Sequence, residues 1–302
     1  MVILVLKKET LDEKFLVRLI KIFTAKKWDI DSKENGEISV FDRFCMRLVE
    51  LESDDDRNFM LDLTEKYLVV DFGMYEKCLL EVFKKFIEEE KELLKTIDVI
   101  HVFPLQDRNP QKTKSGNLMC YILQGYVMRK FDEFHNKQIR IFETFESLKT
   151  HKEEIQILLM VDDYIGSGDT ALSCISLLEE INVSKERMRI LSLVCQNEGK
   201  KYIEDYGVKT YTTIERNKGI SDNYPEEEIE SKLEQMKKMG KRIKAKKDLY
   251  LGYKDTESLV TMIKTPNNTF PIYWHESKKN KKITYAPYPR RGNVGVEVIQ
   301  NE

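Results

Sequence analysis

Hydrophobic residues recur at helical spacing through the first 95 or so residues of the chain. In residues 10–23 the positions on one side of a helix are Leu11, Phe15, Leu19 and Ile22. A second stretch, residues 79–94, places leucines and phenylalanines on one broad face and turns the acidic run 88–90 toward water. The sequence therefore predicts an α-helical N-terminal region.

The pattern changes near residue 97, where short β-type runs begin to alternate with helical ones. Five apolar runs are typical of strands, over residues 99–103, 139–145, 155–161, 189–195 and 208–214. Helical spacing fills intervals between them, over residues 117–131, 170–180 and 200–206. Such alternation predicts βαβ units and a mostly parallel sheet with helices on both faces. We therefore expect a helical region over residues 1–96 and an α/β domain over residues 97–302.

Composition indicates an ordered chain that carries no extreme charge. Of the 302 residues 41% are hydrophobic and 34% are charged, with 50 basic and 52 acidic side chains. This balance excludes a protein that binds nucleic acid through its overall charge. A local basic run, residues 237–247 with seven Lys or Arg, predicts a solvated helix face and leaves nucleic-acid contact there as an alternative.

Cysteine spacing and hydropathy favour a cytoplasmic protein without a membrane span. The five cysteines are widely spaced and form no C-x-x-C motif, so neither a disulfide framework nor a structural zinc site is expected. No apolar run approaches the roughly 18 to 20 residues needed to cross a bilayer. The four histidines form no H-E-x-x-H pair.

Residues 1–96 are acidic, with 17 Lys or Arg against 22 Asp or Glu and a net charge of −5. This charge argues against a DNA-reading domain in that region, because such domains need a basic surface. Docking of a protein partner, or contact between copies of the chain, suits an acidic helical region better. We expect any partner contact to use residues 1–96.

The polar residues with the clearest chemistry follow the strongest strand signal, residues 155–161. Ligands of parallel sheets bind at the carboxyl ends of the strands. Glycines in the turn let backbone N–H groups point inward, and a helix beginning near residue 170 adds the positive end of its dipole. The residues that form this predicted monophosphate cradle are Gly166, Ser167, Gly168, Asp169 and Thr170.

Asp162 and Asp163 are neighbouring carboxylates directly before that turn. Two adjacent charges repel, so keeping both ionised requires vicinal hydroxyls, a Mg²⁺ ion, or both. A sugar diol one phosphate length from the cradle meets this need, so the loop predicts a ribose 5-phosphate site with Mg²⁺ at Asp162 and Asp163. A polar turn after a strand is the alternative, and the absence of G-x-x-x-x-G-K-[ST] disfavours a nucleotide P-loop.

This stretch resembles the signature of the type I phosphoribosyltransferases, in which an apolar strand, two acids, a small-residue loop and a helix follow one another. Four pieces are similar, in order, to a phosphoribosyltransferase-like family of bacterial conflict and anti-phage systems that includes retron-associated members. They are Lys114-Ser115-Gly116, residues 162–168, Leu251-Gly252-Tyr253 and residues 265–274. The resemblance implies a type I phosphoribosyltransferase-like fold preceded by a helical region.

The resemblance also implies the ligand, phosphoribosyl pyrophosphate (PRPP). Asp162 and Asp163 would bind the ribose hydroxyls, and residues 166–170 would bind the 5-phosphate. The loop after the first sheet strand would hold pyrophosphate through Lys112, Lys114, Ser115 and Gly116, with Lys114 neutralising the leaving charge. An ordinary basic turn is the alternative for that loop.

Other positions are weaker candidates. Asn267, Asn268 and Trp274 could form a hood over a planar acceptor, although a turn that feeds a core strand would use the same residues. Arg216 and Asp255 are further candidates near the site. In purine-salvage relatives an acid three positions after the second acid assists the base, and Gly166 occupies that position here, so no purine substrate can be inferred.

The resemblance therefore implies a PRPP-type enzyme acting at C1 of a ribose 5-phosphate, with Mg-pyrophosphate as leaving group and a role in anti-phage defence. Two alternatives stay open. One is a non-catalytic sensor that binds PRPP or a nucleotide only to regulate. The other is a toxic effector that degrades nucleotides or modifies a macromolecule.

Overall fold

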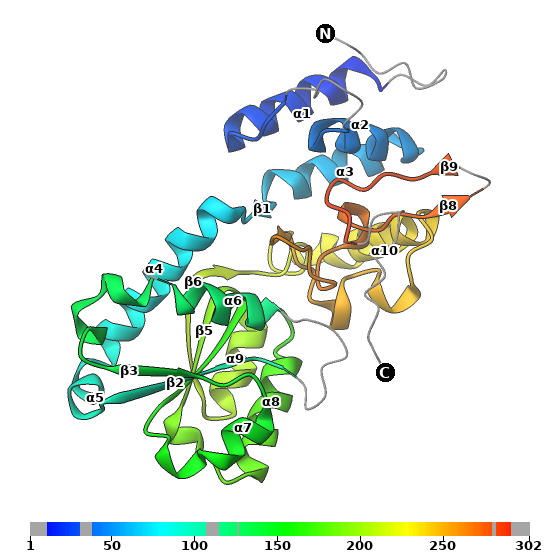
Figure 1. The fold of residues 1–302 in the computed structure, drawn as a ribbon. Coiled ribbons are helices and arrows are strands. Elements are labelled where there is room, and N and C mark those ends of the chain that lie inside the picture. The colour runs from blue at the N-terminus through cyan, green and yellow to red at the C-terminus, as the bar shows by residue number, and fades with distance from the viewer. Residues whose placement is uncertain (1–10, 31–37, 107–114, 126, 280–281, 291–302) are drawn as a thin grey trace. The chain divides into compact units, whose positions relative to one another are not determined.

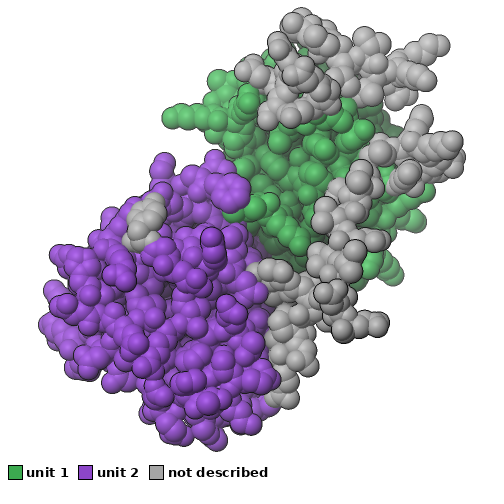
Figure 2. All heavy atoms as spheres, viewed as in Figure 1, with its two compact units in different colours: residues 1–69, 218–302 green, residues 70–217 purple. Residues whose placement is uncertain are grey.

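The computed structural model describes residues 11–30, 38–106, 115–125, 127–279 and 282–290. The chain forms two compact units, which Figure 2 shows in different colours. Unit 1 comprises residues 1–69 and 218–302, and unit 2 comprises residues 70–217. The division expected from the sequence, between residues 96 and 97, does not coincide with these boundaries. Residues 70–96 belong to unit 2 because helix α4 (Phe72–Glu89) packs on the sheet, and residues 218–302 belong to unit 1, where they share a core with the first helices.

Unit 2 contains a five-stranded sheet in which every strand pairs in parallel with its neighbours (Figure 1). The strands lie in the order β3 (Gln138–Ile141), β2 (Val99–Pro104), β4 (Leu158–Ile165), β5 (Met188–Gln196) and β6 (Lys209–Arg216). This confirms the expected α/β fold with a mostly parallel sheet. One boundary differs in a way that matters. Strand β4 continues through Ile165, so Asp162 and Asp163 lie within the strand and not after it.

Helices cover both faces of this sheet. Helices α7 (Phe145–Thr150), α8 (Asp169–Glu180) and α9 (Asn197–Asp205) share a hydrophobic cluster with one face. Helix α4 packs against β5 and β6, and α6 (Ser115–Gln124) against β2 and β4. A short helix, α5 (Lys91–Thr96), follows α4.

The expected helix over residues 117–131 is wrong in its second half. Helix α6 ends at Gln124, and the following glycine, Gly125, makes a turn whose N–H donates to the carbonyl oxygen of Ile122. Glycine is a poor helix former, which favours an end there. Two 3₁₀ turns follow, Met128–Lys130 and Asp132–Phe134.

The order of the strands fixes where a ligand can enter the sheet. The chain leaves β2 through α6 toward β3 on one side, and leaves β4 through α8 toward β5 on the other. The crossovers therefore diverge between β2 and β4, which is the topological switch point where open α/β sheets bind ligands. Strand β2 ends at Pro104, opposite Val161, so the next residues of β4 extend beyond it.

Unit 1 combines the first helices of the chain with its C-terminal part. Its helices are α1 (Glu13–Lys26), α2 (Val40–Glu50), α3 (Asp54–Glu65) and α10 (Glu226–Arg242). The side chains of Asp12, Ser39 and Ser53 cap the first three, and this supports the expected helical N-terminal region. Strand β1 (Leu68–Val69) pairs in parallel with β7 (Val260–Thr261), and β8 (Lys278–Lys279) pairs with β9 (Lys282–Ile283).

The core of unit 1 joins residues far apart in the sequence. Phe23 and Phe44 from the first helices share a hydrophobic cluster with Phe270 and Tyr273 from the C-terminal part. The fully buried Arg47 donates to the backbone oxygen of His275 at 2.5 Å. Along the described parts of the chain, none of the helices has the length and apolar character that a membrane crossing requires.

Candidate functional site

Asp162 and Asp163 lie at the switch point, in the part of β4 that extends beyond β2. Asp163 is 6% exposed and Asp162 is half-buried. On the other side β4 still pairs with β5, where Asp162 lies opposite Ser192. Among the described residues, the sheet therefore pairs the backbone of the acid pair with β5 on one side and with no strand on the β2 side.

Hydroxyl groups hold both acids. The Oγ of Ser115, the first residue of α6, donates to Oδ1 of Asp162 at 2.5 Å, and the backbone N–H of Asp163 donates to the same oxygen at 2.9 Å. The Oη of Tyr75, in α4, donates to Oδ2 of Asp163 at 2.5 Å. Among the described residues, which leave out 107–114, no Lys or Arg forms an ion pair with either acid.

The surroundings oppose ionisation of the pair. Burial, followed by the negative charge of Asp163, raises the pKa of Asp162 well above its usual range. Burial also raises the pKa of Asp163, although the hydrogen bonds from Tyr75 and Ser115 act in the opposite direction. Such a pair is stabilised by any ligand that brings positive charge or hydrogen-bond donors to its oxygens.

The predicted phosphate cradle follows the acid pair directly. Gly168 has φ +84° and caps α8, which begins at Asp169, and the N–H of Asp169 lies 3.5 Å from Oγ of Ser167. Gly168 supplies the left-handed conformation that the turn needs. The start of α8 therefore lies immediately beyond the two acids, with Thr170 in its first turn.

Helix α9 closes the other side of this turn through Gly199, which lies in its first turn. A side-chain carbon on Gly199 would overlap the carbonyl oxygen of Gly166, and one on Gly168 would lie 3.0 Å from the carbonyl oxygen of Gly199. The two backbone segments are therefore in direct contact. The first turn of α9 buttresses the turn at residues 166–168.

The predicted pyrophosphate loop is described only in part. Lys112 and Lys114 lie outside the described residues. Ser115 contacts Asp162 as given above, and Gly116 is buried against the carbonyl oxygen of Val161 in β4. The structure thus brings the end of this loop to the acid pair.

The predicted hood residues lie in unit 1, where their polar groups are used. Asn268 Nδ2 donates to Thr256 Oγ1 at 3.1 Å, and Trp274 Nε1 donates to the backbone oxygen of Thr269 at 2.7 Å. The backbone oxygen of Asn267 accepts from the N–H of Tyr253 at 2.8 Å. Two of the pieces quoted for the family resemblance, residues 251–253 and 265–274, therefore pack on each other, and the hood itself stays a prediction.

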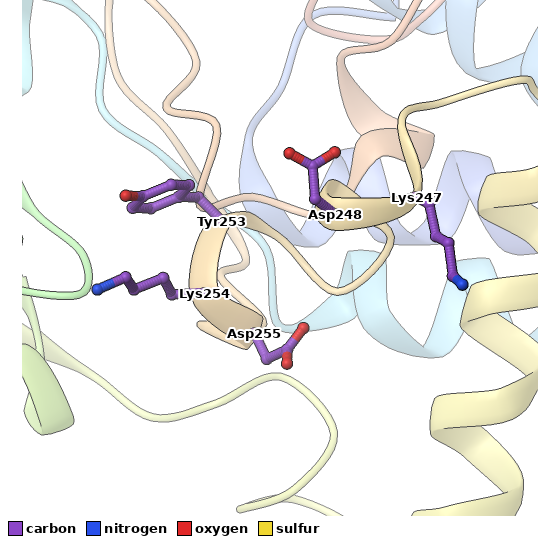
Figure 3. A pocket seen from close by; sticks show the side chains of 5 residues that line it. All are labelled: Lys247, Asp248, Tyr253, Lys254 and Asp255. Atoms are coloured by element: carbon purple, nitrogen blue, oxygen red, sulfur yellow. The ribbon is translucent and has the colours of Figure 1, made fainter.

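Asp255 lines a pocket of about 620 Å³ in unit 1. The other lining residues are Lys247, Asp248, Tyr253 and Lys254. Figure 3 shows that these side chains point in different directions and do not converge on one point. The pocket belongs to unit 1, whereas the acid pair belongs to unit 2.

Two further predicted features can be placed. Arg216 is the last residue of β6, opposite Gln196 in β5. Burial lowers the pKa of Arg216, and the nearby Tyr164 acts in the opposite direction. In the basic run 237–247, Lys237 pairs with Glu234 at 2.6 Å and Arg242 pairs with Glu52 at 2.7 Å.

Sequence reasoning missed two residues of this site, Tyr75 and Gly199. Tyr75 lies in the helical region before the sheet and has no motif around it. Gly199 gave a weak signal, because glycine is a poor helix former and here it lies in the first turn of a helix that directly follows a strand.

The comparison with protein families decides the assignment. The family model PRTase-CE matches residues 49–291, about four fifths of the chain. The chain belongs to the PRTase-CE family. This phosphoribosyltransferase-like assignment agrees with the resemblance expected from the sequence, and the matched segment includes the acid pair, the turn at residues 166–168 and Tyr75.

Three solved structures have a partial likeness to this PRTase-CE chain. Orotate phosphoribosyltransferase from Aeropyrum pernix aligns at 14% identity and TM-score 0.29, covering 48% of this chain and 72% of its own. APRTase from Giardia lamblia, complexed with 9-deazaadenine, aligns at 17% identity and TM-score 0.31, covering 46% of this chain and 79% of its own. Hypoxanthine-guanine phosphoribosyltransferase from Schistosoma mansoni, in complex with IMP, aligns at 14% identity and TM-score 0.31, covering 48% of this chain and 64% of its own. No curated protein sequence matches the chain.

Proposed function

We propose that the protein binds PRPP at the carboxyl end of β4 and transfers its ribose 5-phosphate at C1. One observation carries the proposal: two adjacent, largely buried carboxylates lie at the switch point, held only by hydroxyl and amide donors among the described residues. A vicinal diol supplies two O–H donors to such a pair. The turn at residues 166–168 lies next to it, where the 5-phosphate of the same ligand would reach.

The donor set also suits Mg²⁺. This ion prefers oxygen ligands and commonly binds through one or two carboxylates together with substrate phosphates. Asp162 and Asp163 would hold it, because their burial makes a compensating positive charge favourable. When bound, the ion would neutralise charge on the departing pyrophosphate.

The residues of the chain would act by position and electrostatics. The acid pair would fix the ribose, and the start of α8 with Ser167 and Thr170 would hold the 5-phosphate. In the reaction the bond from C1 to the pyrophosphate oxygen breaks and a bond from C1 to the acceptor forms. Lys114 would help to neutralise the leaving group.

Calorimetry with PRPP and Mg²⁺ tests the proposal on the full chain. We expect the wild type to bind, and the double variant Asp162→Asn/Asp163→Asn to lose at least about 100-fold in affinity, because two charge-assisted contacts are removed. Glu204→Gln/Asp205→Asn removes two carboxylates from the exposed end of α9 in the same unit and should bind as the wild type does. Equal binding by the acid-pair variant would overturn the proposal.

Turnover separates the enzyme from its closest alternative. Release of pyrophosphate in the presence of a suitable acceptor supports transfer, whereas tight binding without release favours a sensor. The sensor alternative is favoured by Gly166, which occupies the position of the acid that assists the base in purine-salvage relatives.

A role in anti-phage defence is the finer part of the proposal, supported by the resemblance to conflict-system families. We expect wild-type expression to reduce phage plaque formation when the neighbouring genes of its native locus are present. The acid-pair variant should lose this protection. Toxicity of the wild type alone, relieved by the same variant, would favour the effector reading.

A further inference from the structure

Tyr75 connects the acid pair to a helix that precedes the whole sheet in the sequence. Its side chain is 3% exposed, and its hydroxyl donates to Oδ2 of Asp163 at 2.5 Å, across 88 positions of sequence. Tyr75 lies in the first turn of α4, whose N-cap is Asp71. The donor to Asp163 therefore comes from an element that carries none of the expected motifs.

Helix α4 is anchored on the sheet at several points, which makes Tyr75 a fixed donor. Thr213 Oγ1 donates to the backbone oxygen of Cys78 at 2.5 Å, and Lys85 Nζ donates to the backbone oxygen of Thr212 at 2.7 Å. The buried face of the helix includes Val82 and Phe86. A hydrogen bond from a rigid element restricts the orientation of the carboxylate that accepts it.

The hydrogen bonds use one named oxygen of each acid. Oδ1 of Asp162 accepts from Ser115 and from the backbone N–H of Asp163, while Oδ2 of Asp163 accepts from Tyr75. A vicinal diol needs one acceptor oxygen from each of two neighbouring carboxylates. Tyr75 therefore fixes Oδ2 of Asp163 from one side, and the orientation of that carboxylate decides how its oxygens meet a diol.

We propose that Tyr75 is a positioning residue of the ligand site, whose hydroxyl orients Asp163 toward the vicinal diol of a ribose 5-phosphate. This inference rests on the proposed function, because it takes the ribose diol as the partner of the acid pair. It adds α4, and with it a part of the chain before the sheet, to the residues that determine affinity.

Tyr75→Phe tests the inference, since it removes only the hydroxyl. Calorimetry would use ribose 5-phosphate with Mg²⁺, and inorganic phosphate as a probe of the phosphate cradle alone. We expect up to about tenfold weaker binding of ribose 5-phosphate, because the ligand must then order the Asp163 side chain itself, and unchanged binding of phosphate. A purely structural role would not separate these two ligands.

Tyr211→Phe is the matched control. Tyr211 is also 3% exposed, and its hydroxyl donates to a carboxylate, Glu90, at 2.6 Å in the same unit. Glu90 follows the last residue of α4, so the control removes a hydroxyl of strand β6 that bonds to a carboxylate at the other end of the helix. We expect Tyr211→Phe to leave binding of ribose 5-phosphate unchanged, with a loss of thermal stability similar to that of Tyr75→Phe.

The outcomes separate this inference from the function on which it rests. If the wild type binds ribose 5-phosphate and Tyr75→Phe binds it equally well, the positioning role is wrong and the proposed function stands. Stronger binding by the variant would mean that Tyr75 competes with the ligand, and equal losses in both Phe variants would mean general loosening; either result overturns the role. If the wild type binds neither PRPP nor ribose 5-phosphate, both proposals fail together.

Discussion

The two ends of the sheet in unit 2 each contain buried carboxylates, but their surroundings are opposite. At the amino ends of the strands, Glu90 is 8% exposed and accepts from Arg189 Nε and from Tyr211 Oη, both at 2.6 Å. At the carboxyl ends, Asp162 and Asp163 accept only from hydroxyl and amide groups among the described residues. Helix α4 reaches both ends, with Tyr75 near its start and Glu90 after its last residue.

The pKa shifts express this difference. Burial alone would raise the pKa of Glu90, but the hydrogen bonds from Arg189 and Tyr211 and the charges of Arg189 and Lys209 lower it below its usual value. The pKa values of Asp162 and Asp163 are both raised. A carboxylate with a lowered pKa is ionised more easily in the folded than in the unfolded chain and so favours folding at neutral pH, whereas a buried pair with raised pKa values is a candidate for ligand binding.

The largest effect on stability is expected at the amino end. Glu90→Gln removes the charge that compensates the half-buried Arg189, and breaking a buried pair in this way costs about 3 kcal/mol. Thermal unfolding of the full chain, with hydrogen exchange of β5 and β6 peptides to assign the change to unit 2, measures it. Ligand affinity should change little, because Glu90 lies at the opposite end from the acid pair.

The neighbouring residue Glu89 is the control. It is about half exposed and pairs with Lys209 at 2.8 Å, so Glu89→Gln should cost less than about 0.5 kcal/mol. If both substitutions cost the same, Glu90 is no more important than a surface residue. The compensated carboxylate at the amino end of the sheet would then make no special contribution to stability.

Much of the site at the carboxyl ends of the strands could be predicted because its residues form one contiguous stretch of sequence. Asp162, Asp163 and the turn at residues 166–168 follow one another, and a parallel strand that leads into a helix places them at the sheet edge by local geometry alone. The residue at which strand β4 ends was less predictable. The apolar pattern ends at Val161, whereas the hydrogen bonding of β4 continues to Ile165 because β5 extends alongside it.

Features that depend on contacts across the sequence could not be predicted. Tyr75 reaches Asp163 only because α4 crosses the sheet, and Gly199 is required only because two backbone segments touch. The core of unit 1 is of the same kind, since Phe44 and Tyr273 are 6.2 Å apart between ring centroids but 229 positions apart in the chain. Hydrophobic periodicity identifies buried faces without naming their partners.

A second prediction concerns the carboxyl end without altering the acids. Gly199→Ala places a methyl group on the carbonyl oxygen of Gly166, so the turn or the start of α9 must shift, at a cost of about 2 kcal/mol. We expect phosphate and ribose 5-phosphate to lose affinity together, since the cradle itself moves. This pattern differs from that of Tyr75→Phe, which should spare phosphate.

Lys201→Ala, on the exposed side of α9, is the control for Gly199→Ala and should change neither binding nor stability by more than about 0.5 kcal/mol. Unchanged phosphate affinity in Gly199→Ala would show that the turn at residues 166–168 does not bind phosphate. The comparison would then rest on the acid pair alone.

The smallest expected change in the free energy of unfolding is a gain and not a loss, and it distinguishes the two ends of the sheet most directly. Asp162→Asn removes one of two neighbouring negative charges from a site that disfavours them, while its side-chain oxygen can still accept from Ser115. We expect the ligand-free protein at neutral pH to gain about 1 kcal/mol in stability, as is common when a functional residue is replaced. Asp169→Asn, also at this end of the sheet, removes a carboxylate from the first turn of α8, where the helix dipole favours it, and should lose a few tenths of a kcal/mol. A loss of stability in Asp162→Asn as large as that of Glu90→Gln would mean that the acid pair is compensated inside the protein, and that the carboxyl end is held together in the same way as the amino end.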